Sequence, residues 1–253
     1  SYLNEIVKNP NKKLSTAWLN GYIGILDAYL GKVPETFTYD GKQYTPRSFA
    51  DMLGLNMNDL VAVSSFTHHP FYKPFVLEVP DNWCNGQYYN VPLEEMMEIV
   101  DNAIDEGYTV LWAADVSEKG FKWYEGVALL PKVDRNKERT GTELARWVKL
   151  RSSEKEDELY DFKGPVEEVE ATQDIRQKGF DNYETTDDHG MVIVGKAVDQ
   201  KGNKYFKVKN SWDTDQVYNG YFYVSETYFK LKTMGIMINK KAIPTSITKK
   251  LGF

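Results

Sequence analysis

Residues 188–195 have the sequence Asp-His-Gly-Met-Val-Ile-Val-Gly, and residues 205–212 have the sequence Tyr-Phe-Lys-Val-Lys-Asn-Ser-Trp. Both are short apolar or alternating runs of the kind that forms β-strands. The polar residues 199–204 between them include a glycine, which indicates a loop that joins neighbouring antiparallel strands. His189 enters the first strand and Asn210 follows the second, so this pairing is expected to bring an imidazole close to an amide.

That juxtaposition is typical of a catalytic site. An amide oxygen bound to one imidazole nitrogen fixes the tautomer and leaves the other nitrogen free to act on a nucleophile. Trp212 is expected to lie over the contact and to keep water from it. Each residue alone has an ordinary structural interpretation, because a histidine at a strand start is often structural and Asn-Ser often forms a turn. The spacing, the strands and Trp212 together favour a site.

The two motifs resemble the second half of papain-like cysteine peptidases. More narrowly, the chain resembles the bleomycin hydrolase and aminopeptidase C group in residues 30–38, 44–49 and 220–229, which include Tyr44-Thr45-Pro46-Arg47 and Gly220-Tyr221-Phe222-Tyr223. The resemblance implies that His189 and Asn210 are catalytic and that Trp212 supports them. It also implies that the nucleophilic Cys and the Gln of the oxyanion hole lie in an upstream segment that this chain does not contain.

Composition excludes several classes of function. The 253 residues are 42% hydrophobic and 27% charged, as in ordinary globular proteins, and the formal net charge of −6 argues against a general nucleic-acid binder. No apolar run approaches the roughly 20 residues of a membrane-spanning helix. A single cysteine, Cys84, forbids a disulfide within the chain. This favours a reducing, cytoplasmic location, although a signal peptide could precede Ser1.

Cys84 and the histidine pair are poor candidates for chemistry. Asn85-Gly86 follows Cys84 and indicates a turn, whereas the nucleophile of papain-like peptidases stands at a helix N-terminus. Cys84 is therefore expected to be a loop or buried thiol. His68 and His69 are adjacent and point different ways, with no further ligand at metal-binding spacing. We therefore predict no metal site and no cofactor, and the resemblance agrees.

The N-terminal third is predicted to be helical and irregular. The pattern indicates two helical pieces broken at Asn9-Pro10, the second a core-facing helix over about 14–30, then a hairpin at Asp40-Gly41 and a helix from Thr45-Pro46 to Gly54. Residues 60–83 have no clear period. We divide the chain into residues 1–92, a segment that packs on the peptidase body, and residues 93–253, a β-rich lobe.

The lobe begins with a helix from Pro92 to Gly107 and a buried strand over residues 108–114. A polar helical insertion is expected over about 131–187, with helices near 144–150 and from Glu167 to Gln177, and with a solvated charge run at 152–158. After Trp212, residues 221–224 form a strand, Ser225 caps a short helix, and residues 234–238 form the last strand. The fold class is α+β, a papain-like peptidase with an antiparallel, β-barrel-like lobe, surrounding helices and a helical insertion.

The leading functional hypothesis is a cysteine peptidase that hydrolyses peptide or amino-acid amide bonds. Its implied partners are the upstream Cys segment, peptide substrates and further copies in a homo-oligomer, a hexamer by resemblance, with no nucleic acid and no membrane. Asp213 stands where the family usually has glycine after Asn-Ser-Trp, which is expected to alter the local turn or to add a negative charge near the cleft. The tail after Ile247 is shorter than the C-terminal arm of the bleomycin hydrolase group, so aminopeptidase and endopeptidase specificity both stay open. The alternatives are an inactive relative that acts as a scaffold or binding subunit and, last, an unrelated β-rich binding protein.

Overall fold

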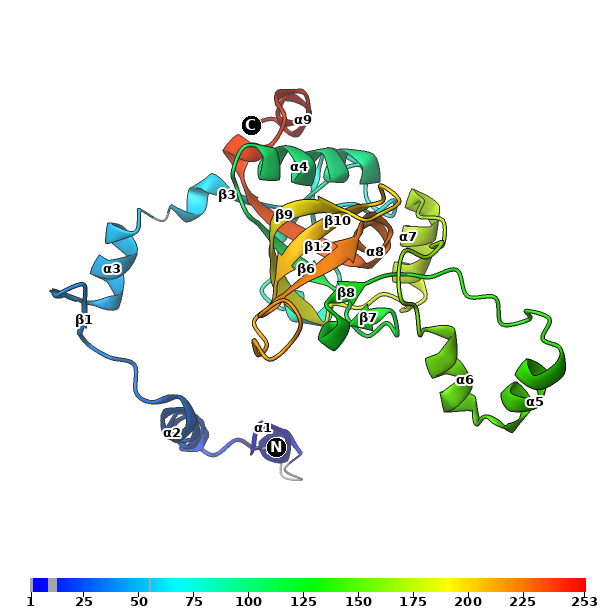
Figure 1. The fold of residues 1–253 in the computed structure, drawn as a ribbon. Coiled ribbons are helices and arrows are strands. Elements are labelled where there is room, and N and C mark those ends of the chain that lie inside the picture. Colours follow the sequence, from blue (N-terminus) through cyan, green and yellow to red (C-terminus); the bar gives the residue numbers. More distant parts are fainter. Residues whose placement is uncertain (1, 9–12, 55) are drawn as a thin grey trace. The chain divides into compact units, whose positions relative to one another are not determined.

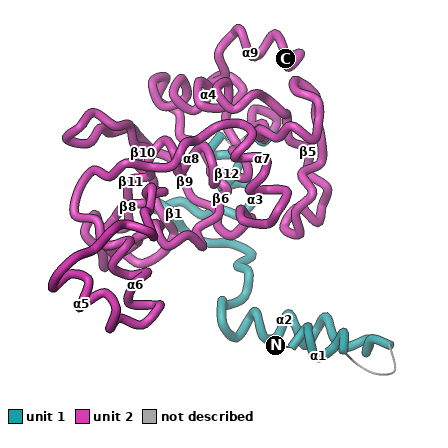
Figure 2. Tube along the Cα trace, turned by 90° about the vertical axis from the view of Figure 1, so that its right-hand side faces the viewer, with its two compact units in different colours: residues 1–57 teal, residues 58–253 magenta. Residues whose placement is uncertain are grey.

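The computed structural model describes residues 2–8, 13–54 and 56–253. It separates into two compact units, residues 1–57 and residues 58–253, coloured separately in Figure 2. The division of the chain at residue 92 that the sequence indicates stays a prediction. Within the described residues no helix is long and apolar enough to cross a membrane.

The described part of the first unit contains three helices and one hairpin: α1 (Tyr2–Val7), α2 (Trp18–Leu30), β1 (Phe37–Tyr39), β2 (Lys42–Tyr44) and α3 (Pro46–Met52). The hairpin turns at Asp40 and Gly41, both with positive φ, as predicted. Thr45 caps α3 by accepting a hydrogen bond from the Ser48 N–H. The expected break at Asn9-Pro10 lies outside the described residues.

Helix α2 departs from its predicted core-facing role. None of its residues is buried, and Ile23, Leu26 and Leu30 are exposed. The periodicity correctly indicated a helix, but a unit of this size, with no buried residue in any of its described helices, has no core to receive the apolar side chains.

The second unit is built on one ten-stranded sheet in the order β4-β5-β3-β12-β6-β9-β10-β11-β8-β7 (Figure 1). Residues 60–90, expected to be irregular, contribute β3 (Leu60–Ser64), β4 (Pro74–Val76) and β5 (Gln87–Asn90). The other strands are β6 (Val110–Ala114), β7 (Phe121–Lys122), β8 (Val127–Ala128), β9 (His189–Val198), β10 (Lys204–Lys209), β11 (Tyr221–Ser225) and β12 (Thr233–Asn239). The α+β class is confirmed. The sheet is mixed, since β3–β5 and β8–β11 are parallel, and it stays open between β4 and β7.

One hydrophobic core joins this sheet to two helices. Helix α4 (Leu93–Asp105) packs beside β6 and β9, and α8 (Glu226–Lys232) packs beside β10, β11 and β12 (Figure 1). Apolar side chains of α4 and α8 are buried, and both helices share one hydrophobic core with Trp112, Ile193 and Phe222 of the sheet. Ser225 caps α8 through the Tyr228 N–H, as expected. The core therefore anchors β6, β9 and β10, the strands around His189.

The remaining helices lie around this body. They are α5 (Gly141–Lys149), α6 (Ser152–Leu159), α7 (Gln173–Asp181) and α9 (Thr245–Leu251). The charge run at 152–158 is helical, and α7 begins six residues later than predicted, at Gln173 after the Thr172 cap. Residues 167–168 are instead held against residues 130–132, where Pro131 and Glu168 form a β-bridge. Backbone pairing there prevents an earlier start of α7.

Candidate active site

His189 and Asn210 come from neighbouring strands of the sheet. His189 is the first residue of β9 and lies opposite Ala114 of β6. Asn210 directly follows β10, and its backbone N–H donates to the Gly220 carbonyl oxygen at 3.0 Å. The antiparallel β9–β10 pairing is the one that the sequence predicts.

A register shift between Lys207 and Val208 puts the two side chains on one face. Before the shift Lys207 lies opposite Gly195, and after it Val208 lies opposite Ile193, so Val194 is the extra residue. The continued register places Asn210 opposite Met191, which shares a face of β9 with His189. Without the shift Asn210 would lie opposite Val192 and would face away from the imidazole, since side chains alternate along a strand. Gly195, next to the extra residue, is a signal that could have revealed this bulge, because an isolated glycine within a strand often marks one.

The imidazole and the amide make a short hydrogen bond. His189 Nε2 lies 2.7 Å from Asn210 Oδ1, which also accepts the Ser211 backbone N–H at 2.7 Å. Because an amide oxygen only accepts, Nε2 carries the proton and Nδ1 keeps its lone pair in the neutral ring. Asn210 is 6% exposed, and within the described residues His189 Nδ1 makes no hydrogen bond. The ring can therefore take a proton at Nδ1 while Asn210 holds Nε2.

Trp212 covers this contact, as the sequence predicts. Its ring lies 5.0 Å from that of His189, with 32° between the planes. It is itself held edge-on by Phe121 at 5.8 Å and by Trp123 at 5.4 Å. Phe121 belongs to β7 and Trp123 to the 3-10 turn after it, and their contacts with Trp212 were not predicted from the sequence. They fix Trp212 although it is 42% exposed.

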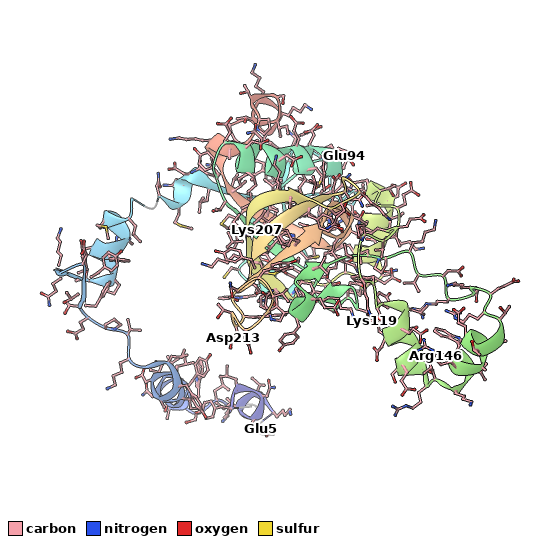
Figure 3. The ribbon with its side chains drawn as sticks, viewed as in Figure 1. Glu5, Glu94, Lys119, Arg146, Lys207 and Asp213 are labelled. Carbon is pink, nitrogen blue, oxygen red and sulfur yellow. The ribbon has the colours of Figure 1, made fainter. Side chains whose placement is uncertain are left out.

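The loop after Trp212 carries Asp213, the departure from the usual glycine. Figure 3 labels Asp213 on the loop that follows β10, and its Oδ1 accepts the Thr214 backbone N–H at 2.6 Å. The side chain is exposed. Asp213 thus stabilises its own turn and presents a carboxylate to solvent beside Trp212.

Cys84 lies in a turn, as predicted. It follows a short 3-10 helix (Pro80–Asn82), and the next residue, Asn85, has a φ of 56°. The thiol is exposed and no helix begins at Cys84. The local backbone therefore lacks the helix N-terminus that would help to hold a thiolate.

The prediction that His68 and His69 point different ways is wrong, because both rings face the carboxylate of Glu78. His69 Nε2 lies 2.6 Å and His68 Nε2 3.2 Å from the two carboxylate oxygens of Glu78, a grouping whose spacing would suit a metal ion. The orientation of the Gln177 amide decides the tautomer of His68. It is fixed because Gln177 Oε1 accepts the Thr67 N–H and Nε2 donates to Asp181. Its Nε2 then faces His68 Nδ1 at 3.0 Å. This arrangement holds His68 in the Nε2–H tautomer, which donates to Glu78 and does not ligate a metal through Nε2.

Comparisons with known proteins agree with the fold and the motifs. Residues 140–252 match the model of the Peptidase C1-like family. The chain is 24% identical over 248 residues to Aminopeptidase C of Lactobacillus delbrueckii subsp. lactis, covering 91% of this chain and 48% of that protein. It is 26% identical over 215 residues to Aminopeptidase C of Lactobacillus helveticus, covering 82% and 41%.

A solved structure with the same fold is that of PepW from Lactobacillus rhamnosis. It matches 99% of this chain and 55% of its own, with a TM-score of 0.63 and 19% identity. The fold is therefore papain-like. Within that class the chain is similar in sequence to the aminopeptidase C group over most of its length. It spans about half the length of the curated relatives it matches, 48% and 41% of the two above.

Proposed function

We propose that this chain supplies the His/Asn half of a cysteine peptidase active site. The observation that carries the proposal is the 2.7 Å contact from His189 Nε2 to Asn210 Oδ1, which leaves Nδ1 available on a papain-like scaffold. The thiol comes from a segment upstream of this chain, in the half of the relatives' length that the chain does not span.

In this mechanism His189 moves two protons. Nδ1 accepts the proton of the Cys thiol, and the thiolate attacks the carbonyl carbon of the scissile amide. The imidazolium then protonates the amine nitrogen as the carbon–nitrogen bond breaks, which leaves a thioester. In the second half His189 accepts a proton from water as water attacks the thioester, and it returns that proton to the Cys sulfur as the carbon–sulfur bond breaks, which releases the acid and restores the thiol. Asn210 holds the ring in the productive orientation, and Trp212 shields the Nε2–Oδ1 bond from water.

The proposed substrates are peptides or amino-acid amides, with the aminopeptidase specificity that the names of the relatives indicate. By resemblance the complete protein is a homo-oligomer, a hexamer, in the cytoplasm, and it uses no cofactor. Helix α2 supports a partner for this chain, since its exposed Ile23, Leu26 and Leu30 form an apolar surface that an upstream segment would cover.

The test is replacement of His189 by Ala in the complete protein. Turnover of an aminoacyl 4-nitroanilide is expected to fall by at least about 10³-fold, because both proton transfers are lost, while thermal unfolding stays nearly unchanged. The matched control is His69→Ala, which removes another partly exposed histidine, one whose ring contacts Glu78 and aromatic neighbours. Activity retained in His189→Ala contradicts the assignment.

Alkylation separates this proposal from the scaffold alternative. In a papain-like pair the thiolate is reactive because the imidazole holds its proton. One cysteine of the complete protein, other than Cys84, is expected to react rapidly with iodoacetamide at mildly acidic pH and to lose that reactivity in His189→Ala. Intact mass locates the label. Slow labelling of every cysteine, independent of His189, would favour an inactive binding subunit.

A further inference from the structure

The segment that leads into His189 has no regular secondary structure, although it must place the imidazole. Residues 184–188 precede β9, and Thr185 is 5% exposed. The Thr185 N–H donates to the Gly179 carbonyl oxygen at 2.9 Å, and the Asp188 N–H donates to that of Ala114 at 3.3 Å. Between these two points, side chains hold the backbone.

Lys232 is one of these side chains. Its residue is 6% exposed, and its Nζ donates to the Glu184 carbonyl oxygen at 2.8 Å and to Thr185 Oγ1 at 3.3 Å. The same ammonium contacts Glu118 Oε1 and lies 3.6 Å from Asp115 Oδ2. One buried cation therefore holds two successive residues of the segment.

Asp115 holds the next residue. It is fully buried, and its Oδ2 accepts the Thr186 backbone N–H at 3.3 Å. Its Oδ1 accepts both the N–H and the hydroxyl of Ser117 at 2.7 Å, which fixes the carboxylate in place. Asp115 and Lys232 are also joined directly, since the Asp115 N–H donates to the Lys232 carbonyl oxygen at 3.0 Å.

The sheet register brings this pair to the site. Asp115 follows Ala114, which lies opposite His189 on one side and opposite Thr233 on the other. Lys232 immediately precedes Thr233. Asp115 and Lys232 are therefore the immediate chain neighbours of Ala114 and Thr233, which lie in the same cross-strand row as His189.

We propose that the buried Asp115–Lys232 pair is the positioning device for His189, because together they hold the backbone of residues 184–186 that delivers the imidazole to Asn210. This inference rests on the proposed function, and it adds two positioning residues to that site. A buried ion pair is weak evidence for stability, since apolar residues of similar volume often replace such pairs without loss. Apolar residues could not replace the hydrogen bonds that the pair makes with the segment. Lys232 donates to Glu184 and Thr185, and Asp115 accepts from Thr186.

The experiment compares Lys232→Met, the double variant Asp115→Asn/Lys232→Met, and the control Lys230→Met. The double variant removes both charges and so avoids a buried unpaired carboxylate if the single variant unfolds. Lys230 lies on the same helix and contacts Glu94 and Glu226, away from the segment before His189. The primary readout is the ring nitrogen spectrum of His189 in the ¹⁵N-labelled chain, assigned by comparison with His189→Ala.

The parent chain and Lys230→Met are expected to show the Nε2–H tautomer alone at a pH where the ring is neutral. The folded Lys232 variants are expected to show mixed tautomers. In the complete enzyme the same variants should lower kcat by about 10²-fold and change KM by less than about twofold, as expected for a misplaced catalytic group. A folded double variant that keeps the single Nε2–H tautomer overturns the proposal. The tautomer measurement does not depend on activity. It therefore tests this proposal even if neither the parent protein nor any variant hydrolyses a peptide.

Discussion

The sheet around His189 and the projecting segment of residues 134–165, which contains α5 and α6, use charge in opposite ways. Beside His189, Asp115 and Lys232 are buried and bind backbone groups of residues 184–186. In the projecting segment neither helix buries a residue, and pairs such as Arg146–Glu158 lie at the surface, with side chains 66% and 32% exposed. Figure 3 labels Arg146 on this segment, away from the sheet.

The difference shows where the constraint on function lies. A buried charge must be satisfied in one geometry, so it can specify the position of a neighbour. An exposed pair gains little and tolerates many geometries. The sheet and its buried pair are therefore expected to respond strongly to substitution, and the projecting segment weakly.

The largest expected effect is on the sheet core. Trp112 is fully buried in β6, stacks on Phe229 at 5.9 Å, and donates to Thr233 Oγ1 at 2.8 Å. Trp112→Ala should lower the free energy of unfolding by about 3–5 kcal/mol, because it leaves a large cavity between the sheet and α8. Urea unfolding of the chain measures this. A loss below about 1 kcal/mol would mean that the sheet is not the stable body of this chain.

Much of this body was predictable from the sequence because its signals are local. The β9–β10 pair, the α4 helix and the Ser225 cap depend on neighbouring residues, and the pair indicated that His189 and Asn210 lie close together, although the bulge is what turns both side chains to one face. Strands β3 and β5 were missed because they pair in parallel across distant residues and lie among prolines. The same reason hid Lys232, whose partners Asp115 and Thr185 lie far away in sequence. The bulge at Val194 has one sequence signal, the adjacent Gly195.

The second expected effect concerns acid. Burial by itself raises the pKa of the Asp115 carboxyl, but hydrogen bonds from Ser117 and the Lys232 charge outweigh it, so the pKa lies below its usual value. A carboxyl of this kind stabilises the fold above its unfolded pKa, about 3.9, and that contribution is lost as the pH falls through the folded pKa.

The free energy of unfolding should therefore decline below about pH 4. The decline should be shallower in Asp115→Asn/Lys232→Met, which removes the titrating group together with its partner. Urea unfolding at a series of pH values provides the measurement. Identical acid profiles for the two proteins would assign the decline to other carboxyls.

The third effect is small. Arg146→Ala breaks the exposed pair with Glu158 and should change the free energy of unfolding by less than about 1 kcal/mol, since solvent already screens the two charges. Its counterpart is Lys232→Met in the buried pair, for which a loss of about 3–5 kcal/mol is expected. If both variants lost the same free energy of unfolding, the buried and the exposed ion pairs would contribute equally to stability, and the contrast between the two regions would be wrong.

The smallest effect is expected from removing the projecting segment. Its two ends are already joined, because the Lys132 N–H donates to the Glu167 carbonyl oxygen at 2.8 Å and Pro131 bridges Glu168. Replacing residues 134–165 by about four Gly and Ser residues shortens a loop whose closure cost depends only weakly on length. The segment is tied to the body mainly by exposed interactions, such as the Lys119–Glu156 pair and the hydrogen bond from Lys201 to the Pro165 carbonyl oxygen.

The shortened chain should keep its free energy of unfolding within about 1 kcal/mol and retain the Nε2–H tautomer of His189. Urea unfolding and the ring nitrogen spectrum test the two halves of this expectation. A large loss of stability would show that the segment carries part of the core. An unchanged free energy of unfolding together with mixed tautomers of His189 would mean that the projecting segment also helps to position the imidazole. The two regions would then not differ in their effect on His189.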